Sequence, residues 1–465
     1  MSPLSVRGRG SRILRNFFAD SRGTVAIMLG LSALPLFLAA GVAIDTARVT
    51  REQAAFAAAV DSAALAIAAS DRGDLTGLTE SQKQARLEEL EAYAATYIGE
   101  NYTPQFNDDT VIDTDLEITD TEVLLGATHD YPMTIMKLAG IQELSLNAFS
   151  EVTKSGNSIE VALVLDNTGS MAGTKITDLK AAANKFIDTV VSDDQIPFYS
   201  KVAIVPYSMG VNVDTYATAA RGSINSGTST TPGSAKFRFT NREGNQRTYD
   251  ISTCVSERTG SNAYTDAAVG TSPVGRVYPP PDKPCLSSKL QPLTSDKPAL
   301  HASINAMEGV GSTAGQVGIA WGWYTLSPNI GLWSGSSAPA AYNAERLKKI
   351  MILMTDGEYN TNYCKGVRSN TSIIGAGGAA STHINCPAPN GNFYTQAETM
   401  CAALKAQGII VYTVEFELLN TTAAQNLVKN CASGGSFQYP ASDSSKLEAA
   451  FEGIAKSLLA LRLSK

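Results

Sequence analysis

The chain has 465 residues, which is enough for about two or three domains. Hydrophobic residues make up 44% and charged residues 17%, as in ordinary globular proteins. The net charge of −7 at pH 7 argues against nucleic-acid binding, and no basic run interleaved with aromatic residues occurs in the long C-terminal part.

An apolar stretch near the N-terminus predicts a membrane anchor. Residues 23–44 carry no charge and are long enough to cross a bilayer as a helix, which tolerates Pro35. The preceding tail, residues 1–22, contains five arginines, so the positive-inside rule keeps it in the cytoplasm and places the bulk of the chain outside. The alternatives are a cleaved signal peptide, with cleavage near 38–43, and a buried soluble helix. The length of the apolar run favours a retained anchor.

A small α+β module is expected at 45–155. The Ala-rich segment 45–70 continues the membrane helix, either as a solvated stalk or as a packing surface. A second helix is expected at 87–100. Alternating apolar residues between 111 and 152 predict three strands, with a short helical piece, TIMKLAGI, before the last of them.

From residue 156 the pattern changes to alternating strands and helices. This alternation predicts an α/β domain over 156–465, with a doubly wound, mainly parallel sheet covered by helices on both faces. A Ser-, Thr-, Gly- and Pro-rich stretch at about 209–298 is too long for an ordinary loop, so we expect an ordered insertion. The aromatic residues Trp321, Trp323 and Tyr324 recur on a predicted helix, where core packing is expected.

The six cysteines all follow residue 250, and none forms a CxxC pair. An even number in a loop-rich segment outside the cytoplasm indicates disulfides rather than zinc ligands or unpaired buried thiols. Fifteen connectivities are possible, and we adopt sequential pairing. The candidates are Cys254 with Cys285, Cys364 with Cys386, and Cys401 with Cys431.

Oxygen-bearing side chains gather where predicted strands end. Asp166, Thr168 and Ser170 occupy alternate positions after the strand VALVLD, and Asp356 follows the strand MILMT. Thr313 lies in a small-residue turn between them. Because ligands of such sheets bind at the carboxyl ends of strands, these five residues can converge. Hydroxyls and carboxylates suit Mg²⁺ or Mn²⁺, with Ca²⁺ less favoured.

This pattern resembles the metal-ion-dependent adhesion site of the von Willebrand factor A family, over about residues 157–465. Asp166-Asn167-Thr168-Gly169-Ser170 matches the Asp-x-Ser-x-Ser motif of that family, with Thr168 at the first Ser position. Thr313 and Asp356 match its later Thr and Asp. The resemblance implies that the three hydroxyls bind the metal, that the two aspartates act directly or through water, and that a carboxylate from a partner protein completes the coordination.

The N-terminal part resembles the TadE/TadG group of tight-adherence (Flp) pilus assembly proteins, through the apolar run and the segment AVDSAALAIAAS. Ile27 and Met28 stand where pilins of this machinery carry a Glu, so we do not expect prepilin-type cleavage. The resemblance implies a single-pass protein of the bacterial inner membrane with a pilin-like module. Its implied role is pilus assembly or a pilus-associated function, with a pilus component or surface receptor as partner.

Three alternatives stay open. Asp166 could simply cap the next helix. The chain could act as a direct surface adhesin. DNTGS is also close to the phosphorylation motif of haloacid dehalogenase-type phosphotransferases, although no Lys is clearly placed for that chemistry. The histidines, at 129, 301 and 383, are scattered over unrelated elements, and we expect no catalytic activity.

Overall fold

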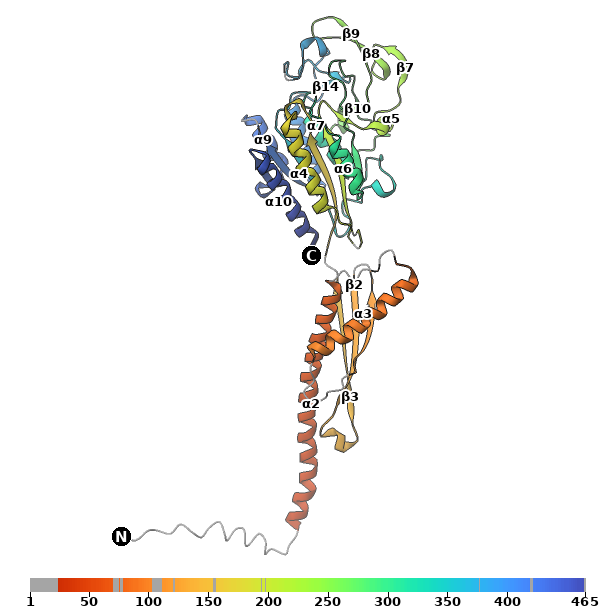
Figure 1. Ribbon diagram of the computed structural model, residues 1–465, viewed down its shortest axis with the longest axis vertical. Helices are drawn as coiled ribbons and strands as arrows, with labels where there is room; N and C mark the ends of the chain where they lie inside the picture. Colours follow the sequence, from red (N-terminus) through yellow and green to blue (C-terminus); the bar gives the residue numbers. More distant parts are fainter. Residues whose placement is uncertain are drawn as a thin grey trace, which may run out of the picture. The chain divides into compact units, whose positions relative to one another are not determined.

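The computed structural model describes residues 24–69, 75, 78–102, 111–119, 122–153, 156–193, 195–196, 198–375, 377–418 and 421–463. The chain divides into two compact units, Met1–Lys154 and Ser155–Lys465 (Figure 1). The expected cytoplasmic tail, 1–22, lies outside the described residues.

Unit 1 begins with one continuous helix, α2 (Thr24–Ala68), which contains both the apolar run and the Ala-rich segment. Pro35 lies inside it. Among the described residues, one helix has the length and composition needed to cross a membrane, and it covers Ile27–Ala68. The apolar side chains of its first half are exposed within unit 1, as in Leu36 and Phe37.

The second half of α2 packs on a three-stranded antiparallel sheet, in the order β1 (Asp113–Ile118), β2 (Glu122–Pro132) and β3 (Glu143–Thr153). Its small and apolar side chains form a core with this sheet and with α3 (Glu80–Asn101). The Ala-rich segment is therefore a packing surface and not a solvated stalk.

Two elements of unit 1 differ from expectation. Helix α3 begins seven residues earlier than the expected 87–100, because Thr79 and Gln82 form a reciprocal capping box at its start. The expected helical piece between β2 and β3 is a single 3₁₀ turn, η2 (Met136–Ala139), which Gly140 ends with a positive φ of 92°.

Unit 2 is a mixed α/β domain, as the sequence predicts. Its central strands pair in parallel in the order β5-β4-β13-β16-β17. They are β4 (Ser158–Asp166), β5 (Ser200–Tyr207), β13 (Leu347–Thr355), β16 (Ile410–Phe416) and β17 (Gln438–Ala441). Antiparallel strands continue the sheet beyond β5, namely β6 (Val211–Asn212), β10 (Cys254–Ser256), β11 (Gly275–Arg276) and β12 (Gln291–Thr294).

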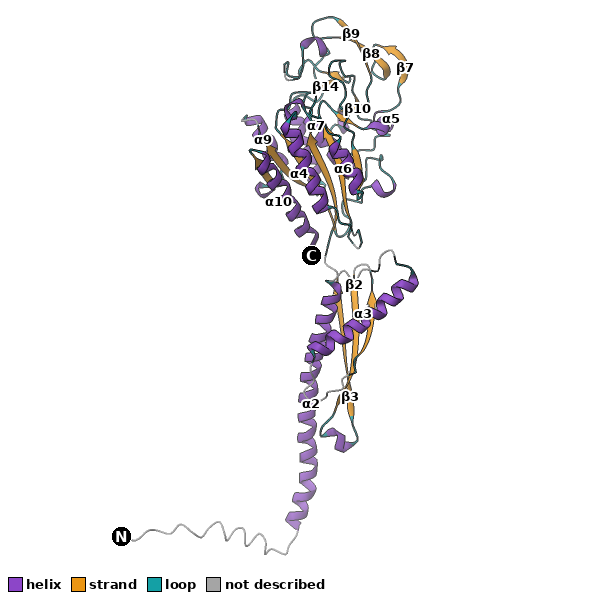
Figure 2. Ribbon diagram, in the orientation of Figure 1, coloured by secondary structure: helices purple, strands orange, loops and turns teal. Residues whose placement is uncertain are grey.

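Helices cover the sheet on two sides (Figure 2). One hydrophobic cluster joins it to α4 (Thr174–Val190), α6 (Lys297–Asn305) and α10 (Ser444–Leu463). A second cluster joins it to α7 (Gly315–Leu326), α8 (Phe393–Ala406) and α9 (Thr422–Cys431). Every residue of α7 is buried, including Trp321, Trp323 and Tyr324, so the prediction of core packing for these aromatics is confirmed.

The expected insertion at 209–298 is ordered, but parts of it belong to the main sheet: β6, β10, β11 and, as an antiparallel partner of β5, β12. The remainder contains α5 (Ala217–Arg221) and a small sheet of β7 (Asn225–Ser229), β8 (Ser234–Thr240) and β9 (Gln246–Asp250). It shares a hydrophobic cluster with a second excursion, residues 357–392, which carries the hairpin β14 (Tyr363–Cys364) and β15 (Val367–Arg368). The remaining short 3₁₀ turns are η3 (Gly169–Met171), η4 (Asp214–Tyr216), η5 (Gly260–Asn262), η6 (Gly335–Ser337), η7 (Ala380–Thr382) and η8 (Gly435–Phe437).

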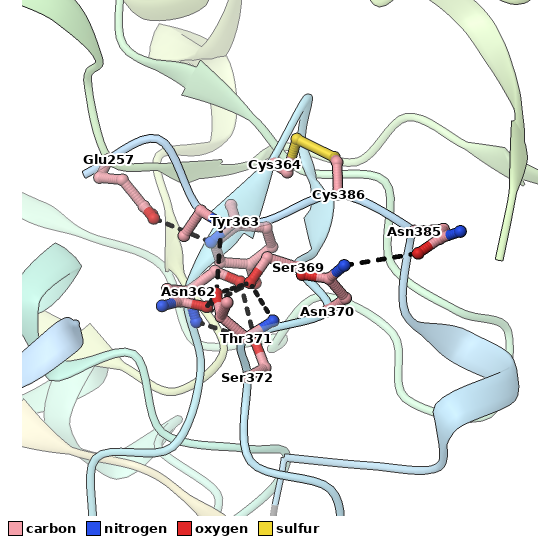
Figure 3. The surroundings of a disulfide bond; sticks show 11 residues. Glu257, Asn362, Tyr363, Cys364, Ser369, Asn370, Thr371, Ser372, Asn385 and Cys386 are labelled. Atoms are coloured by element: carbon pink, nitrogen blue, oxygen red, sulfur yellow. Dashed lines mark hydrogen bonds between the residues drawn. A yellow bond between two sulfur atoms is a disulfide. The ribbon is translucent and has the colours of Figure 1, made fainter. Parts of the chain in front are cut away.

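The sequential disulfide pairing is confirmed, because the bonds are Cys254–Cys285, Cys364–Cys386 and Cys401–Cys431. The second closes the excursion that carries β14 and β15 (Figure 3). Beside it, the backbone N–H of Tyr363 donates to Glu257 Oε1 of the insertion at 2.9 Å (Figure 3). The disulfide therefore closes the second excursion on itself, and a hydrogen bond and an apolar cluster hold the two excursions together.

Candidate metal centre

Two acidic residues lie side by side at one edge of the parallel sheet. Asp166 is the last residue of β4, and Asp356 directly follows β13. These strands pair in parallel with Leu165 opposite Met354, so their carboxyl ends coincide. Both aspartates are buried, Asp166 completely. The structure thus brings together two of the five predicted site residues.

The Asp166 carboxylate is held by three donors. Its Oδ1 accepts a 2.9 Å hydrogen bond from the backbone N–H of Thr168. Its Oδ2 accepts from the hydroxyls of Tyr207, at 2.9 Å, and Thr355, at 3.3 Å. Burial, together with the negative charge of Asp356, nevertheless raises the pKa of Asp166 to about 7. Among the residues that the structure describes, no cationic side chain forms an ion pair with either aspartate, so nothing offsets their mutual repulsion.

The hydroxyls of Thr168 and Ser170 point at one another. Thr168 Oγ1 and Ser170 Oγ lie 2.9 Å apart, Thr168 being buried and Ser170 exposed. Helix α4 begins after Gly173, which provides no side-chain cap. The alternative in which Asp166 caps the next helix is therefore wrong, and the DNTGS loop presents its oxygens between the buried acids and solvent.

Thr313 joins the site through its backbone. The loop that precedes it is bonded to the DNTGS loop, since Val310 N–H donates to Asn167 O at 2.8 Å and Gly169 N–H donates to Gly311 O at 3.0 Å. On its other side, Thr313 N–H donates to Asn360 Oδ1 at 2.9 Å, and Asn360 N–H donates to Thr313 O at 3.0 Å. Three loops thus form one connected layer, and all five predicted residues belong to it.

Several residues of this layer were not predicted from the sequence. Tyr207 and Thr355 orient Asp166, and Asn360 ties Thr313 to the loop that follows Asp356. The position of Tyr207, at the end of the neighbouring strand, is the signal that could have identified it. The hydroxyls of Ser208 and Ser312 are buried and make no hydrogen bond, so further oxygens are available beside the predicted set.

The donor set fits a small divalent cation held partly by hydroxyls. Among the described residues no group of three or more His, Cys, Asp and Glu side chains could hold a metal, and the candidate site has two carboxylates. Two carboxylates buried together without a cation repel one another, and a divalent ion would offset both their repulsion and their desolvation. Uncharged hydroxyls from Thr168, Ser170 and Thr313 would then complete an all-oxygen shell, which suits Mg²⁺ or Mn²⁺.

The histidines take no part in this layer. His129 Nδ1 donates at 3.2 Å to Val111 O in unit 1. His301 contacts Asp188 at 2.9 Å on the surface of unit 2, and His383 is buried in the second excursion.

Scans against protein-family models and against curated proteins find no match for this chain. Among solved structures, the chain is similar to the vWF domain of the type V pili tip protein Mfa5 from Porphyromonas gingivalis, with a TM-score of 0.38, 12% identity, and coverage of 67% of this chain and 98% of that one. It is also similar to the pilus adhesin RrgA from Streptococcus pneumoniae, with a TM-score of 0.36, 11% identity, and coverage of 76% and 49%. For the pilus adhesin SpaC from Lactobacillus rhamnosus GG the TM-score is 0.34, the identity 14%, and the coverage 77% and 36%. The chain thus spans about half or less of the length of the last two proteins.

Proposed function

We propose that this chain is a membrane-anchored, pilus-associated protein that binds a protein partner through a divalent cation at the edge of its α/β unit. The single observation that carries the proposal is the buried pair Asp166 and Asp356, placed beneath hydroxyls of which Ser170 reaches solvent. A buried pair of acids is costly unless something neutralises it.

The cation, Mg²⁺ or Mn²⁺, would be held by Thr168, Ser170 and Thr313, with the two aspartates binding directly or through water. When bound, it supplies a positive charge at the exposed side of the loop layer. An acidic side chain of the partner is the natural complement of that charge, because a carboxylate is a preferred ligand of these ions.

Binding rather than catalysis is the better use of Asp166. A phosphotransferase of the type that DNTGS resembles needs this residue as an exposed nucleophile. Here both carboxylate oxygens accept hydrogen bonds, and the side chain is fully buried. A residue held in this way can orient a cation but is not free to attack a phosphoester.

The arrangement of unit 2 supports an A-type fold with a doubly wound sheet. Its parallel order β5-β4-β13-β16-β17, the antiparallel strand β12 beside β5, and helices on both faces are the features expected of that fold. In unit 1, a long N-terminal helix packed on an antiparallel sheet supports a pilin-like module of the TadE/TadG type. The arginines ahead of the apolar run support a cytoplasmic N-terminus in the inner membrane.

Metal binding is tested with Asp166→Ala, titrated with Mn²⁺ and Mg²⁺ by calorimetry. We expect the variant to lose saturable binding. Glu308→Gln is the matched control, because it removes an exposed negative charge near Val310 without touching the proposed ligands. Unchanged affinity in Asp166→Ala would remove the metal site, and equal losses in both variants would reduce it to a general attraction of cations.

The biological role is tested by placing Asp166→Ala at the native locus beside a deletion of the whole gene. Loss of pili in both strains supports a role in assembly that depends on the metal. Intact pili with lost attachment would instead assign the protein as a direct adhesin. Normal pili and normal attachment in both strains would refute the proposal.

A further inference from the structure

We infer that the tip of the β2–β3 hairpin, residues 133–144, inserts into the outer interfacial layer of the membrane that α2 crosses. The inference depends on the anchoring part of the proposed function and adds a second lipid contact to it. The exposed apolar tip would contact the headgroup and upper acyl region of the bilayer.

Hydrogen bonds between the hairpin and α2 show which residues of the two elements lie at the same height along the helix axis. Asn147 O accepts from Gln53 Nε2 at 2.7 Å, and Thr134 Oγ1 accepts from Arg48 at 3.1 Å. Closer to the apolar run, Asp45 Oδ2 accepts from the backbone N–H groups that open the η2 turn, those of Ile135 at 2.8 Å and Met136 at 2.7 Å. The hairpin therefore extends along α2 toward its membrane end.

The lowest of these contacts lies within the apolar run itself. A Cβ atom on Gly41 would overlap the side chain of Ile135, so the absence of a side chain at Gly41 lets the tip lie directly against the helix. Gly41 precedes Asp45, the first charged residue after the uncharged stretch, by about one helical turn. The 21 residues from Thr24 to Ile44 span roughly 31 Å as a helix, close to the thickness of a hydrocarbon core of about 30 Å. If that core surrounds the run, Ile135 lies at its outer boundary.

The residue spacing along β3 gives the same position of the tip relative to α2 by a second measure. Strand residues advance about 3.3 Å each, so Leu144 lies roughly 10 Å below Asn147. That distance corresponds to about seven helical residues below Gln53, which is the level of Thr46. Ile141 and Leu138 continue beyond Leu144 in the same direction, toward the apolar run.

Most side chains at this level suit a lipid surface, and Glu143 is the exposed acidic exception. Leu138 is 83% exposed within unit 1, and Ile141 and Leu144 are exposed as well. Lys137 is exposed beside Leu138. Arg48 lies farther from the apolar run along α2, where it donates to Thr134. Apolar side chains at the tip with basic side chains at and above it match acyl chains below anionic headgroups. Asp45 does not oppose this arrangement, because it is buried and its carboxylate binds the backbone of the turn.

The inference is tested with environment-sensitive fluorophores on single cysteines. The chain's six cysteines are all disulfide-bonded, so one added thiol is labelled selectively. Full-length protein carrying Leu138→Cys is reconstituted in vesicles of phosphatidylcholine and phosphatidylglycerol, with and without nitroxide-bearing lipid. We expect blue-shifted emission that lipid nitroxides quench. Phe149→Cys is the matched control, because Phe149 is also apolar and 68% exposed but lies on β3 beyond Asn147, away from the apolar run.

Leu36→Cys, within the apolar run, reports on the anchor separately. Quenching at Leu36 and Leu138 but not at Phe149 supports the inference. Quenching at Leu36 alone overturns it and leaves the anchor in place, whereas no quenching at Leu36 overturns the anchor itself. A blue shift at Leu138 without lipid quenching would mean that protein covers the tip, which also overturns the inference.

Discussion

The hydroxyl of Tyr207 donates a 2.9 Å hydrogen bond to Asp166 Oδ2, and through it the end of β5 orients the acid at the end of β4. Burial and the charge of Asp166 raise the pKa of Tyr207 well above its ordinary value, so this residue remains a neutral donor. The orientation of this candidate metal ligand therefore depends on a side chain that belongs to the core of the sheet.

Replacing Tyr207 by Phe tests that dependence. The substitution removes one donor to the Asp166 carboxylate and keeps the ring that packs in the core. Loss of a residue that orients a metal ligand typically costs about 10–100-fold in metal affinity. We expect a loss within that range for Mn²⁺, measured by calorimetry, with little change in fold by circular dichroism.

Tyr359→Phe is the matched control for this experiment. Tyr359 is also buried beside Asp166, but its hydroxyl donates no hydrogen bond to the Asp166 carboxylate. Its removal should leave Mn²⁺ affinity close to that of the unaltered protein. Equal losses in the two variants would mean that Tyr207 acts through packing and not through its hydroxyl.

Gly318→Ala is expected to disturb the site from the far side of Tyr207. Helix α7 lies close to the sheet because glycine faces it, and a Cβ on Gly318 would come within 2.6 Å of Tyr207 Cγ and Cδ1. Overpacking of this kind costs about 1–3 kcal/mol. We expect a lower free energy of unfolding in urea together with weaker Mn²⁺ binding by the folded protein.

The comparison for Gly318→Ala is Gly322→Ala on the same helix. Its added methyl group would meet Val164 and Met351 in the core, and no Tyr207 contact is involved. This variant should lose stability without a comparable loss of metal affinity. If both variants lost metal affinity in proportion to stability, the direct link through Tyr207 would be refuted.

The fold was predictable where one local pattern decides it. Alternating strands and helices predicted the α/β unit, and the apolar run predicted a helix that the structure extends without a break into the Ala-rich segment. Element ends were less predictable, because they depend on local caps such as the box formed by Thr79 and Gln82. Strand β12 was missed, because a four-residue strand in a polar segment leaves no period to detect.

The candidate site was predictable only for residues within motifs. Asp166, Thr168 and Ser170 lie close together in the sequence, and their spacing alone indicated that they could bind the same cation. Tyr207, which orients Asp166, ends the neighbouring strand, and Asn360, which binds Thr313, lies in another loop. Only strand register and loop closure bring these two residues to the site. Composition was also insufficient for the Ala-rich segment, because it allowed both a solvated stalk and a packing surface. The contacts of this segment with the sheet decide between the two.

Removing the disulfide Cys364–Cys386 should loosen the two excursions and leave the sheet intact. The bond spans 22 residues in sequence, and closing a loop of that length contributes about 3 kcal/mol in the chain-entropy description. We expect the double variant Cys364→Ala, Cys386→Ala to show faster amide exchange in β8, β9 and β14, measured by mass spectrometry, with unchanged protection in β4 and β13. Uniformly faster exchange would show instead that the excursions and the sheet unfold as one unit.

The free energy of unfolding of unit 2 should fall as the pH rises in the metal-free protein. With a bound metal it should instead rise with pH. The pKa of Asp166 is raised in the folded protein to about 7, so the folded state holds a proton that the unfolded state has released at pH 5 or 6. Without metal, the contribution of Asp166 is most favourable below its unfolded pKa of about 4 and is lost as the pH rises through about 7. With saturating Mg²⁺ the carboxylate is neutralised by the ion, and stability should rise over the same interval because protons no longer compete for the site. Urea unfolding of the metal-free and Mg²⁺-bound protein between pH 4 and 8 measures both slopes. In Asp166→Asn the two slopes should coincide, and a persisting difference would show that Mg²⁺ stabilises the chain from another site.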